Sequence, residues 1–331
     1  MIRVQNLTKY YGERLAVDDI SFNVEKGEIL GLLGPNGAGK TTAMRIITGF
    51  LMPTQGDVWV ADCNMADNSL EGRRHIGYLP EAIPLYTDVT VRSYLDFAGR
   101  IRGMDSNRVK TRIDDVVELC RLEEYIDVLI GKLSRGFRQR VGVAQAIIHE
   151  PEVMILDEPT LGIDPIQVSQ TRQLIKDLGQ NHTILLSSHI LPEVSMTCDR
   201  VVIIHEGRIV AEDKIENLST IIKESRNIRM EIRGPAGEVT TKLSKIEGVR
   251  QVRYEEPHHF VDCSPEQDLR PKLMEAIVQG GWVLLGMETV EMSLEDIFLE
   301  LTTEEYDEDE ESLSTENEES LSAEDEEGAE A

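Results

Sequence analysis

The stretch Gly34-Pro35-Asn36-Gly37-Ala38-Gly39-Lys40-Thr41 decides the fold of this chain. A glycine and four further residues precede Gly-Lys-Thr, which is the spacing of a phosphate-binding loop. Residues 28–33 before it predict a short buried strand, and the helix that follows continues through Thr42 to residue 47. This context favours a nucleoside triphosphate site over a glycine-rich turn that carries a lysine by chance.

Each residue type in the loop has a chemical task at such a site. Glycines let successive backbone N–H groups point inward, and the following helix N-terminus adds positive potential where phosphates dock. Lys40 is expected to reach the β- and γ-phosphates, and the Thr41 hydroxyl is expected to ligate Mg²⁺. Thr42 extends the nucleotide-binding segment by one residue. The loop therefore predicts a nucleoside triphosphate and Mg²⁺ as ligands.

Composition limits the classes of protein to which the chain can belong. A length of 331 residues suggests two domains, and 40% hydrophobic residues suffice for proper cores. The formal net charge is −27, but residues 304–331 hold 15 acidic and no basic residues, which leaves −12 for the rest. This acidity argues against binding nucleic acid or an anionic membrane through a broad basic face.

Neither a zinc site nor a membrane span is predicted. The cysteines are scattered without metal-like spacing, which favours incidental thiols in a reducing compartment: Cys63, Cys120, Cys198 and Cys263. No run approaches the roughly 18 apolar residues that a span requires. The first residues lack the apolar core of a signal peptide. We therefore expect a cytoplasmic chain that reaches a membrane only through a partner.

Residues 1–219 are expected to form an α/β domain. Short apolar strands alternate with helical segments, and the apolar runs 153–156 and 183–186 predict strands buried on both faces. This is the pattern of a parallel sheet flanked by helices. A mostly helical insertion at about residues 86–135 separates the phosphate loop from the next core strand.

Residues 220–303 differ in character and predict a small α+β domain. Strand, helix, strand, strand, helix and strand are favoured in this order over 227–233, 238–246, 249–255, 259–263, 266–279 and 282–287. That order is typical of a ferredoxin-like domain. A last helix is predicted at 293–299, with Ser293 as its N-cap and Asp296 as the capping-box partner. The acidic tail 304–331 repels itself and is expected to be disordered.

Two carboxylates follow the strand at 153–156. Asp157 is expected to help hold Mg²⁺, as strand-end aspartates do in phosphate-loop enzymes. Glu158, one residue further and pointing elsewhere, is placed to polarise an attacking water as a general base. Beside a phosphate loop, the pair favours a hydrolytic site over a solvated acidic turn.

The stretch Leu133-Ser134-Arg135-Gly136-Phe137 begins a helix and carries a resemblance to a known family. The chain resembles the nucleotide-binding subunit of an ABC transporter, whose signature motif is Leu-Ser-Gly-Gly-Gln. Ser134 and Gly136 match this motif, whereas Arg135 and Phe137 depart from it. In that family the signature contacts the γ-phosphate held by the other subunit. The resemblance thus implies an ATP-dependent homodimer that closes head-to-tail.

Further family landmarks appear in order. Tyr11 matches the aromatic residue that stacks on adenine, and Asp164 matches the nucleotide-facing loop after the Asp157 strand. His189 matches the switch histidine that senses the γ-phosphate, so the resemblance places it with Lys40 and Glu158 in catalysis. Taken alone, a histidine after a strand is more often structural, and a tyrosine at position 11 would be an ordinary strand residue.

Glu81 stands where most of the family carries a glutamine. A carboxylate there can still meet Mg²⁺ or a water molecule, although it adds negative charge near a triphosphate. The alternative is that Glu81 only faces the membrane partner. We assign it to the metal site.

The resemblance covers residues 1–220 and is closest to ABC-2 type ATP-binding subunits, with multidrug and sodium-efflux subunits as close relatives. The Leu-Pro-Glu and Leu-Ser-Arg-Gly-Phe variants and the segment Ser293-Leu294-Glu295-Asp296-Ile297-Phe298 are similar to the gliding-motility-associated subgroup. The resemblance implies an ATPase on the inner face of the cell membrane. It would power a separate ABC-2 type permease, most simply for export.

Two other classes of protein remain open at this stage. A soluble ABC protein acting on ribosomes or DNA would carry two such domains or a long coiled coil, whereas this chain has one phosphate loop and no sustained heptads. A regulator without turnover is disfavoured because the hydrolytic residues are all present: Lys40, Thr41, Asp157, Glu158 and His189. For the small domain, the sequence favours a dimer-contact or regulatory role, and a passive structural role is the alternative.

Overall fold

The computed structural model describes residues 1–217, 226–264 and 268–290, and the chain divides into two compact units. The first unit is Met1–Ile215, and the second begins at Glu216. The helix expected at 293–299 and the acidic tail 304–331 lie outside the described residues.

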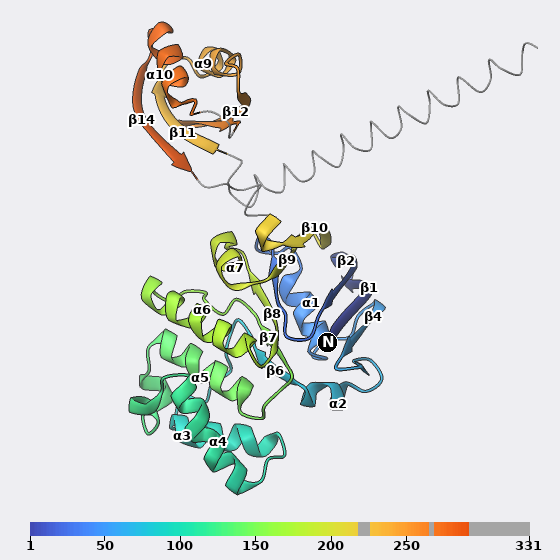
Figure 1. Cartoon of the computed structure of the whole chain (residues 1–331). Helices are drawn as coiled ribbons and strands as arrows, with labels where there is room; N and C mark the ends of the chain where they lie inside the picture. The colour runs from blue at the N-terminus through green and yellow to red at the C-terminus, as the bar shows by residue number, and fades with distance from the viewer. Residues whose placement is uncertain (218–225, 265–267, 291–331) are drawn as a thin grey trace, which may run out of the picture. The chain divides into compact units, whose positions relative to one another are not determined.

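A six-stranded sheet in the first unit carries the phosphate loop (Figure 1). Its order is β10-β9-β3-β8-β7-β6, with the bounds β3 Ile29–Leu33, β6 Ile76–Leu79, β7 Val153–Leu156, β8 Thr183–Ser188, β9 Arg200–His205 and β10 Arg208–Lys214. From β9 to β6 the strands are parallel, and β10 pairs antiparallel with β9. The predicted parallel sheet is confirmed. Every residue of β3, β7 and β8 is buried, which explains their continuous apolar runs.

The first unit also contains a second sheet, which the sequence analysis did not predict. It has the order β2-β1-β4-β5, is antiparallel, and comprises β1 Ile2–Tyr11, β2 Arg14–Val24, β4 Gln55–Val60 and β5 Cys63–Asn64. The register of β1 with β2 shifts three times, so its burial alternates irregularly. Such bulged strands give a weak periodic signal in the sequence.

The helices of the first unit are α1 Lys40–Ile47, α2 Ser69–Arg74, α3 Val91–Ile101, α4 Ser106–Leu119, α5 Arg135–Ile147, α6 Pro165–Gly179 and α7 Leu191–Thr197. Short 3₁₀ turns lie at Glu123–Tyr125 and Ile130–Lys132. Figure 1 shows α3 and α4 grouped beside α5 at one end of the unit. The core strand β6 precedes these helices, so, contrary to expectation, the helical segment does not separate the phosphate loop from the next core strand. Thr90 and Asp105 cap the first turns of α3 and α4 with their side-chain oxygens.

Helix α1 is fixed in place by the core of this unit. Its residues Ala43, Met44, Ile46 and Ile47 are buried in one cluster with side chains from both sheets. This packing holds the loop between β3 and α1 at the carboxyl end of the parallel strands. Functional sites of open α/β sheets lie at that edge.

The second unit contains β11 Arg226–Arg233, α9 Ala236–Leu243, β12 Val249–Glu255, β13 His258–Cys263, α10 Arg270–Gln279 and β14 Val283–Val290. Its sheet has the order β12-β13-β11-β14, and every pair is antiparallel. Apolar side chains from the two helices and the sheet form a separate core. The order of the elements is the expected strand, helix, strand, strand, helix, strand.

Two further expectations concern membranes and thiols. Within the described residues, no helix is both long enough and apolar enough to cross a bilayer. The four cysteines are free, and three of them are buried: Cys120, Cys198 and Cys263.

Replacing Gly77 in β6 tests the packing of α5 on the sheet. An added Cβ would lie 2.3 Å from the carbonyl oxygen of Ala146 in α5, and backbone cannot move aside easily. We expect Gly77→Ala to lower the free energy of unfolding by about 1–3 kcal/mol. In the control Gly72→Ala, the nearest atom is the flexible Met65 sulfur, so the loss should be smaller. Urea unfolding measures both, followed by Trp59 fluorescence in a background in which Trp282 is replaced by Phe. Equal losses would contradict the prediction.

Candidate functional site

The loop between β3 and α1 has a backbone that only glycine adopts easily. Gly37 and Gly39 have φ angles of 86° and 107°, in the left-handed region. A Cβ on Gly39 would also lie 2.6 Å from the carbonyl oxygen of Ala16. Helix α1 begins directly after Gly39 without a side-chain cap. Its first N–H groups are therefore available to an anionic ligand.

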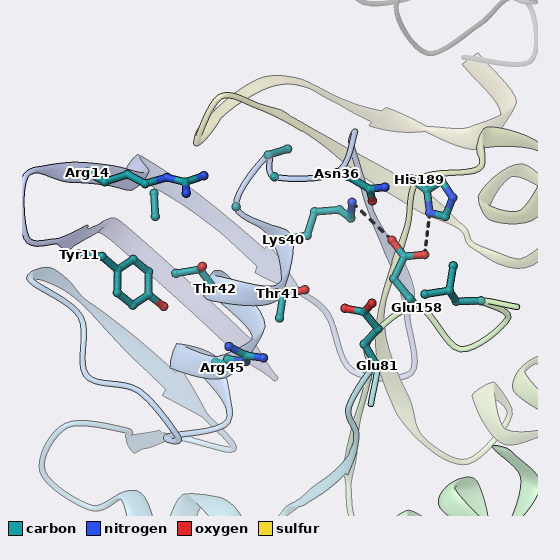
Figure 2. Close-up of a pocket in the computed structure, with 15 residues that line it drawn as sticks. Tyr11, Arg14, Asn36, Lys40, Thr41, Thr42, Arg45, Glu81, Glu158 and His189 are labelled. Atoms are coloured by element: carbon teal, nitrogen blue, oxygen red, sulfur yellow. Dashed lines mark hydrogen bonds and ion pairs between the residues drawn. The ribbon is translucent and has the colours of Figure 1, made fainter. Parts of the chain in front are cut away.

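A pocket of about 580 Å³ opens over this loop (Figure 2). It lies within the roughly 300–1,000 Å³ typical of ligand sites. Its lining comprises Tyr11, Arg14, Ala16, Asn36, Gly37, Ala38, Gly39, Lys40, Thr41, Thr42, Arg45, Glu81, Glu158, Leu161 and His189. Residues from the phosphate loop, β1 and the ends of β6, β7 and β8 thus meet in one cavity.

The Lys40 ammonium is held inside this pocket by its own loop. Its Nζ donates to the carbonyl oxygens of Gly34 at 2.6 Å and Pro35 at 3.1 Å. It also lies 3.4 Å from Oε1 of Glu158, and both side chains are more than 90% buried. Gly34 and Pro35 therefore bind Lys40 through their carbonyl oxygens and do not line the pocket. A phosphate that binds this cation would compete with Glu158 for it.

Glu158 is placed between Lys40 and His189 (Figure 2). The Nδ1 of His189 hydrogen bonds to Oε2 of Glu158 at 2.9 Å. The Glu158 backbone N–H donates to Oγ of Ser187 at 2.9 Å, and its φ is 48°. A left-handed backbone is costly for a residue with a Cβ, and such residues gather at functional sites. This turn directs Glu158 away from the line of β7 and into the pocket.

Asp157 is fully buried and is joined by a hydrogen bond to Thr41, which lines the pocket. Its Oδ1 accepts hydrogen bonds from Ser187 Oγ at 2.7 Å and Thr41 Oγ1 at 3.3 Å, while Oδ2 has no partner among the described residues. Burial raises the pKa of Asp157, and the nearby charges of Glu81 and Glu158 raise it further. Ser187 was missed in the sequence, although it lies only two residues before His189.

These oxygens fit Mg²⁺. The hydroxyl of Thr41, the unpartnered Oδ2 of Asp157 and, across the pocket, Glu81 are hard oxygen donors of the kind that this ion binds. In the described part of the chain, no group of three or more His, Cys, Asp or Glu residues is arranged to hold a metal ion alone. Mg²⁺ usually keeps some ligands from substrate phosphates, so Thr41 and Asp157 would hold it together with ATP.

Two arginines at the pocket were missed in the sequence. Arg14 begins β2 and pairs with Tyr11 at the end of β1, so both face the same end of the pocket. Arg45 lies one helical turn after Thr41 on α1, a spacing that puts both on one helix face. The signal for Arg45 was this i, i+4 spacing; for Arg14 it was the short Gly12-Glu13 connection after Tyr11.

Gly34, Pro35 and Asp157 contact residues of the pocket without lining it, and three further residues of the expected site do not line it either. Ser134 is the N-cap of α5 and accepts from the N–H of Phe137. Asp164 is the N-cap of α6 and accepts from Ile166 and Gln167. Gly136, in the first turn of α5, packs against Gln167. Within one chain, the structure therefore does not bring Ser134, Gly136 and Asp164 to the phosphate loop.

The first unit has a strand, a glycine-rich loop and a helix N-terminus with a buried lysine. Two carboxylates follow β7, a parallel strand of the same sheet that is separated from β3 by β8. These features define a P-loop nucleotide-binding domain. Comparison with known proteins identifies the kind. The ABC transporter family profile matches residues 17–161. The chain belongs to the ATP-binding proteins of ABC transporters. It is an ATP-binding subunit of such a transporter and an ATPase.

Individual relatives cover nearly the whole chain. The bacitracin transport ATP-binding protein BcrA of Bacillus licheniformis is 36% identical over 305 residues, which are 91% of this chain and 97% of BcrA. The linearmycin resistance ATP-binding protein LnrL of Bacillus subtilis (strain 168) is 31% identical over 306 residues, 91% of this chain and 98% of LnrL. The gliding-motility subgroup finds no support in these relatives.

Solved structures agree with the fold of the first unit. An ATP-binding subunit of an ABC transporter superimposes with a TM-score of 0.61 at 30% identity, covering 67% of this chain and 92% of that one. A dimeric ATP-binding cassette in a post-hydrolysis state, bound to ADP and phosphate, gives 0.60 at 25% identity and covers 65% and 99%.

Substituting Asp157 tests its buried charge. Because its pKa is raised in the folded protein, the charged carboxylate costs stability above that pKa, and the cost vanishes below its ordinary value of 3.8. We expect Asp157→Asn to raise the melting temperature of the ligand-free protein at pH 7, with a gain that shrinks on acidification. It should also weaken the extra stabilisation by ATP with Mg²⁺. The exposed control Asp88→Asn should change neither; an unchanged melting temperature for Asp157→Asn contradicts the prediction.

Tyr11 and Tyr10 provide a matched pair for the adenine contact. Tyr11 lines the pocket and Tyr10 does not, although both are exposed at the end of β1. We expect Tyr11→Ala to weaken ATP binding by about 1–3 kcal/mol, the scale of base stacking on an aromatic ring. Tyr10→Ala should leave the affinity unchanged. Titration calorimetry decides, and the opposite ranking would show that the base stacks elsewhere.

Proposed function

We propose that this chain powers a separate ABC-2 type permease, and that two copies close head-to-tail over ATP to do so. The observation that carries the proposal is the division of the site. Lys40, Glu158 and His189 meet in one pocket, while Ser134 and Gly136 lie elsewhere on the same chain. A second copy can supply the missing groups, since backbone amides at the start of α5 form an anion site.

The contacts of Glu158 suggest how the residues of the pocket act in hydrolysis. ATP phosphates would displace Glu158 from Lys40, because both compete for one buried ammonium group. The released carboxylate can orient a water and accept its proton, a task worth about 10²–10⁴ in rate. His189, already bonded to Glu158, would hold the carboxylate in place. Bound Mg²⁺ would supply charge neutralisation at the phosphates, held by Thr41 and Asp157.

Export is the direction that the relatives favour. Their names concern bacitracin transport, linearmycin resistance and Nod factor export, the last for a protein of Burkholderia thailandensis that is 33% identical over 310 residues, 92% of this chain and 97% of that one. We extend this to the chain as an exporter subunit on the inner face of the cell membrane, attached through its permease.

The second unit is proposed to be a ferredoxin-like accessory domain. Its β-α-β-β-α-β order and the antiparallel sheet β12-β13-β11-β14 support this topology. We assign it a dimer-contact or regulatory role, over a passive structural one. If a chain of residues 1–219 still binds ATP but no longer dimerises, the dimer-contact role is supported.

Glu158→Gln tests the shared site. The amide keeps the shape of the side chain but removes the general base and the charge that competes for Lys40. We expect hydrolysis to fall by about 10² or more, whereas ATP-dependent dimerisation becomes stronger because the closed state is no longer discharged. Adding Ser134→Arg should abolish the ATP-induced dimer, because a bulky side chain would occupy the contact with the partner's phosphate.

Sedimentation with and without ATP measures both variants, in detergent-solubilised membranes that contain the permease as well as for the chain alone. A Glu158→Gln protein that stays monomeric at saturating ATP in both settings would contradict the composite site. ATP binding by the monomer is the control, because the phosphate loop and Tyr11 both belong to one chain.

A further inference from the structure

Two buried hydroxyl groups lie close in sequence to the residues assigned to hydrolysis. Thr160 follows Glu158 by two residues in the loop after β7, and Ser188 ends β8 directly before His189. Thr160 is 7% exposed and Ser188 is 2% exposed. Each hydroxyl is therefore shielded from water and needs a hydrogen-bond partner within the protein.

Both hydroxyls bind one carboxylate oxygen of Glu193, in α7. This oxygen, Oε2, accepts from Thr160 Oγ1 at 2.5 Å and from Ser188 Oγ at 3.4 Å. An ionised carboxylate can only accept, so the two hydroxyls are the donors. The Ser188 oxygen also accepts from the backbone N–H of Ile190 at 3.0 Å. Glu193 thus joins the loop after β7 to the loop after β8.

Helix α7 gives Glu193 a fixed base. Leu191 and Val194 of α7 are buried, and a Cβ placed on Gly31 of β3 would lie 2.4 Å from Cγ1 of Val194. The helix therefore packs closely against β3, the strand that leads into the phosphate loop. Glu193 itself does not line the nucleotide pocket. It is placed to act through the residues that it holds and not by contact with a nucleotide.

These contacts form a closed ring, which includes the hydrogen bond between Glu158 and His189 (Figure 2). The members of the ring are, in order, Glu158, His189, Ser188, Glu193, Thr160 and Pro159. Pro159 stiffens the link between Thr160 and Glu158, because its pyrrolidine ring fixes its φ. A shift of Thr160 is therefore passed on to Glu158, and a shift of Ser188 is passed on to His189.

Glu158 needs such support because its backbone is strained. Its φ of 48° lies in the left-handed region, which a residue with a Cβ keeps only where the surrounding structure holds it there. Under the proposed function, ATP phosphates compete with Glu158 for Lys40, so one contact of the carboxylate is weakened when ATP binds. The restraint through Thr160 and Glu193 does not involve Lys40. It would still orient the carboxylate when a nucleotide is present.

We propose that Glu193 is a positioning residue for ATP hydrolysis, which holds the loops after β7 and β8 at the spacing where Glu158 and His189 stay hydrogen bonded. The inference rests on the proposed role of Glu158 as general base. It assigns to Glu193 a share of the turnover rate and none of the affinity for ATP, because Tyr11 and the backbone amides of the phosphate loop are not part of the ring.

Removal of the carboxylate tests the inference in the full chain. We expect Glu193→Ala to lower kcat about tenfold, a part of the about 10²–10⁴ that a general base is worth, with the KM for ATP unchanged. Glu193→Gln should have a kcat between those of Glu193→Ala and the wild type. Its amide oxygen can still accept from both hydroxyls, but without the assistance of a charge. The matched control is Ser195→Ala, whose hydroxyl donates to the Leu191 carbonyl within α7; its kcat should not change.

A double-mutant cycle separates positioning from a general loss of structure. In the Glu158→Gln background the base is already absent, so adding Glu193→Ala should cause no further loss of the single-turnover rate. Thr160→Val removes one donor and leaves the carboxylate in place, and it should also lower kcat. This variant decides the question if thermal melting shows that Glu193→Ala does not fold.

An unchanged kcat in Glu193→Ala, or in Thr160→Val where the first variant does not fold, overturns the inference. So does a full further loss in the Glu158→Gln background, or a raised KM with kcat intact, because either result places the effect in the fold or in ATP binding. A Glu193→Gln variant no more active than Glu193→Ala overturns it as well, since the hydrogen bonds would then not be what matters. The proposed function fails by a different result, namely wild-type hydrolysis by Glu158→Gln.

Discussion

The buried ammonium of Lys40 is the charge around which the first unit is arranged. A cation this far from water needs partners, and it finds the carbonyl oxygens of Gly34 and Pro35 and the carboxylate of Glu158. The first two partners require the loop to fold back on itself, which left-handed glycines allow. The third ties β7 to the loop, and His189 extends the link to the end of β8. A nucleotide phosphate at Lys40 would compete with these partners.

The sequence predicted the parts of the structure whose signals are local. The phosphate loop has a characteristic spacing of glycines and lysine. The buried strands β7 and β8 have continuous apolar runs, and the two carboxylates directly follow one of these strands. It also predicted the order of elements in the second unit, where strands and helices alternate cleanly. The antiparallel sheet of β1, β2 and β4 was missed, because bulges in β1 interrupt the period-two pattern.

The rest of the site depends on tertiary contacts that no local pattern encodes. Ser187 touches Asp157 and Glu158 only because β7 and β8 are neighbours in the sheet. Arg14 reaches the pocket through its pairing with Tyr11. Likewise, the sequence predicted the order in which the motifs of Ser134 and Asp164 follow one another, but not their positions in the fold. In the structure, each side chain caps the start of its own helix.

That engagement limits which sequences can occupy these two positions. An N-cap must offer a short side chain with an oxygen, and its loss costs typically about 1 kcal/mol before any ligand is considered. Position 134 is therefore restricted to a few residue types by the start of α5, and position 164 by the start of α6. Positions 135 and 137 carry no such requirement. A signature segment can therefore carry arginine and phenylalanine at these positions, as this chain does. The start of α5 and its backbone amides are retained.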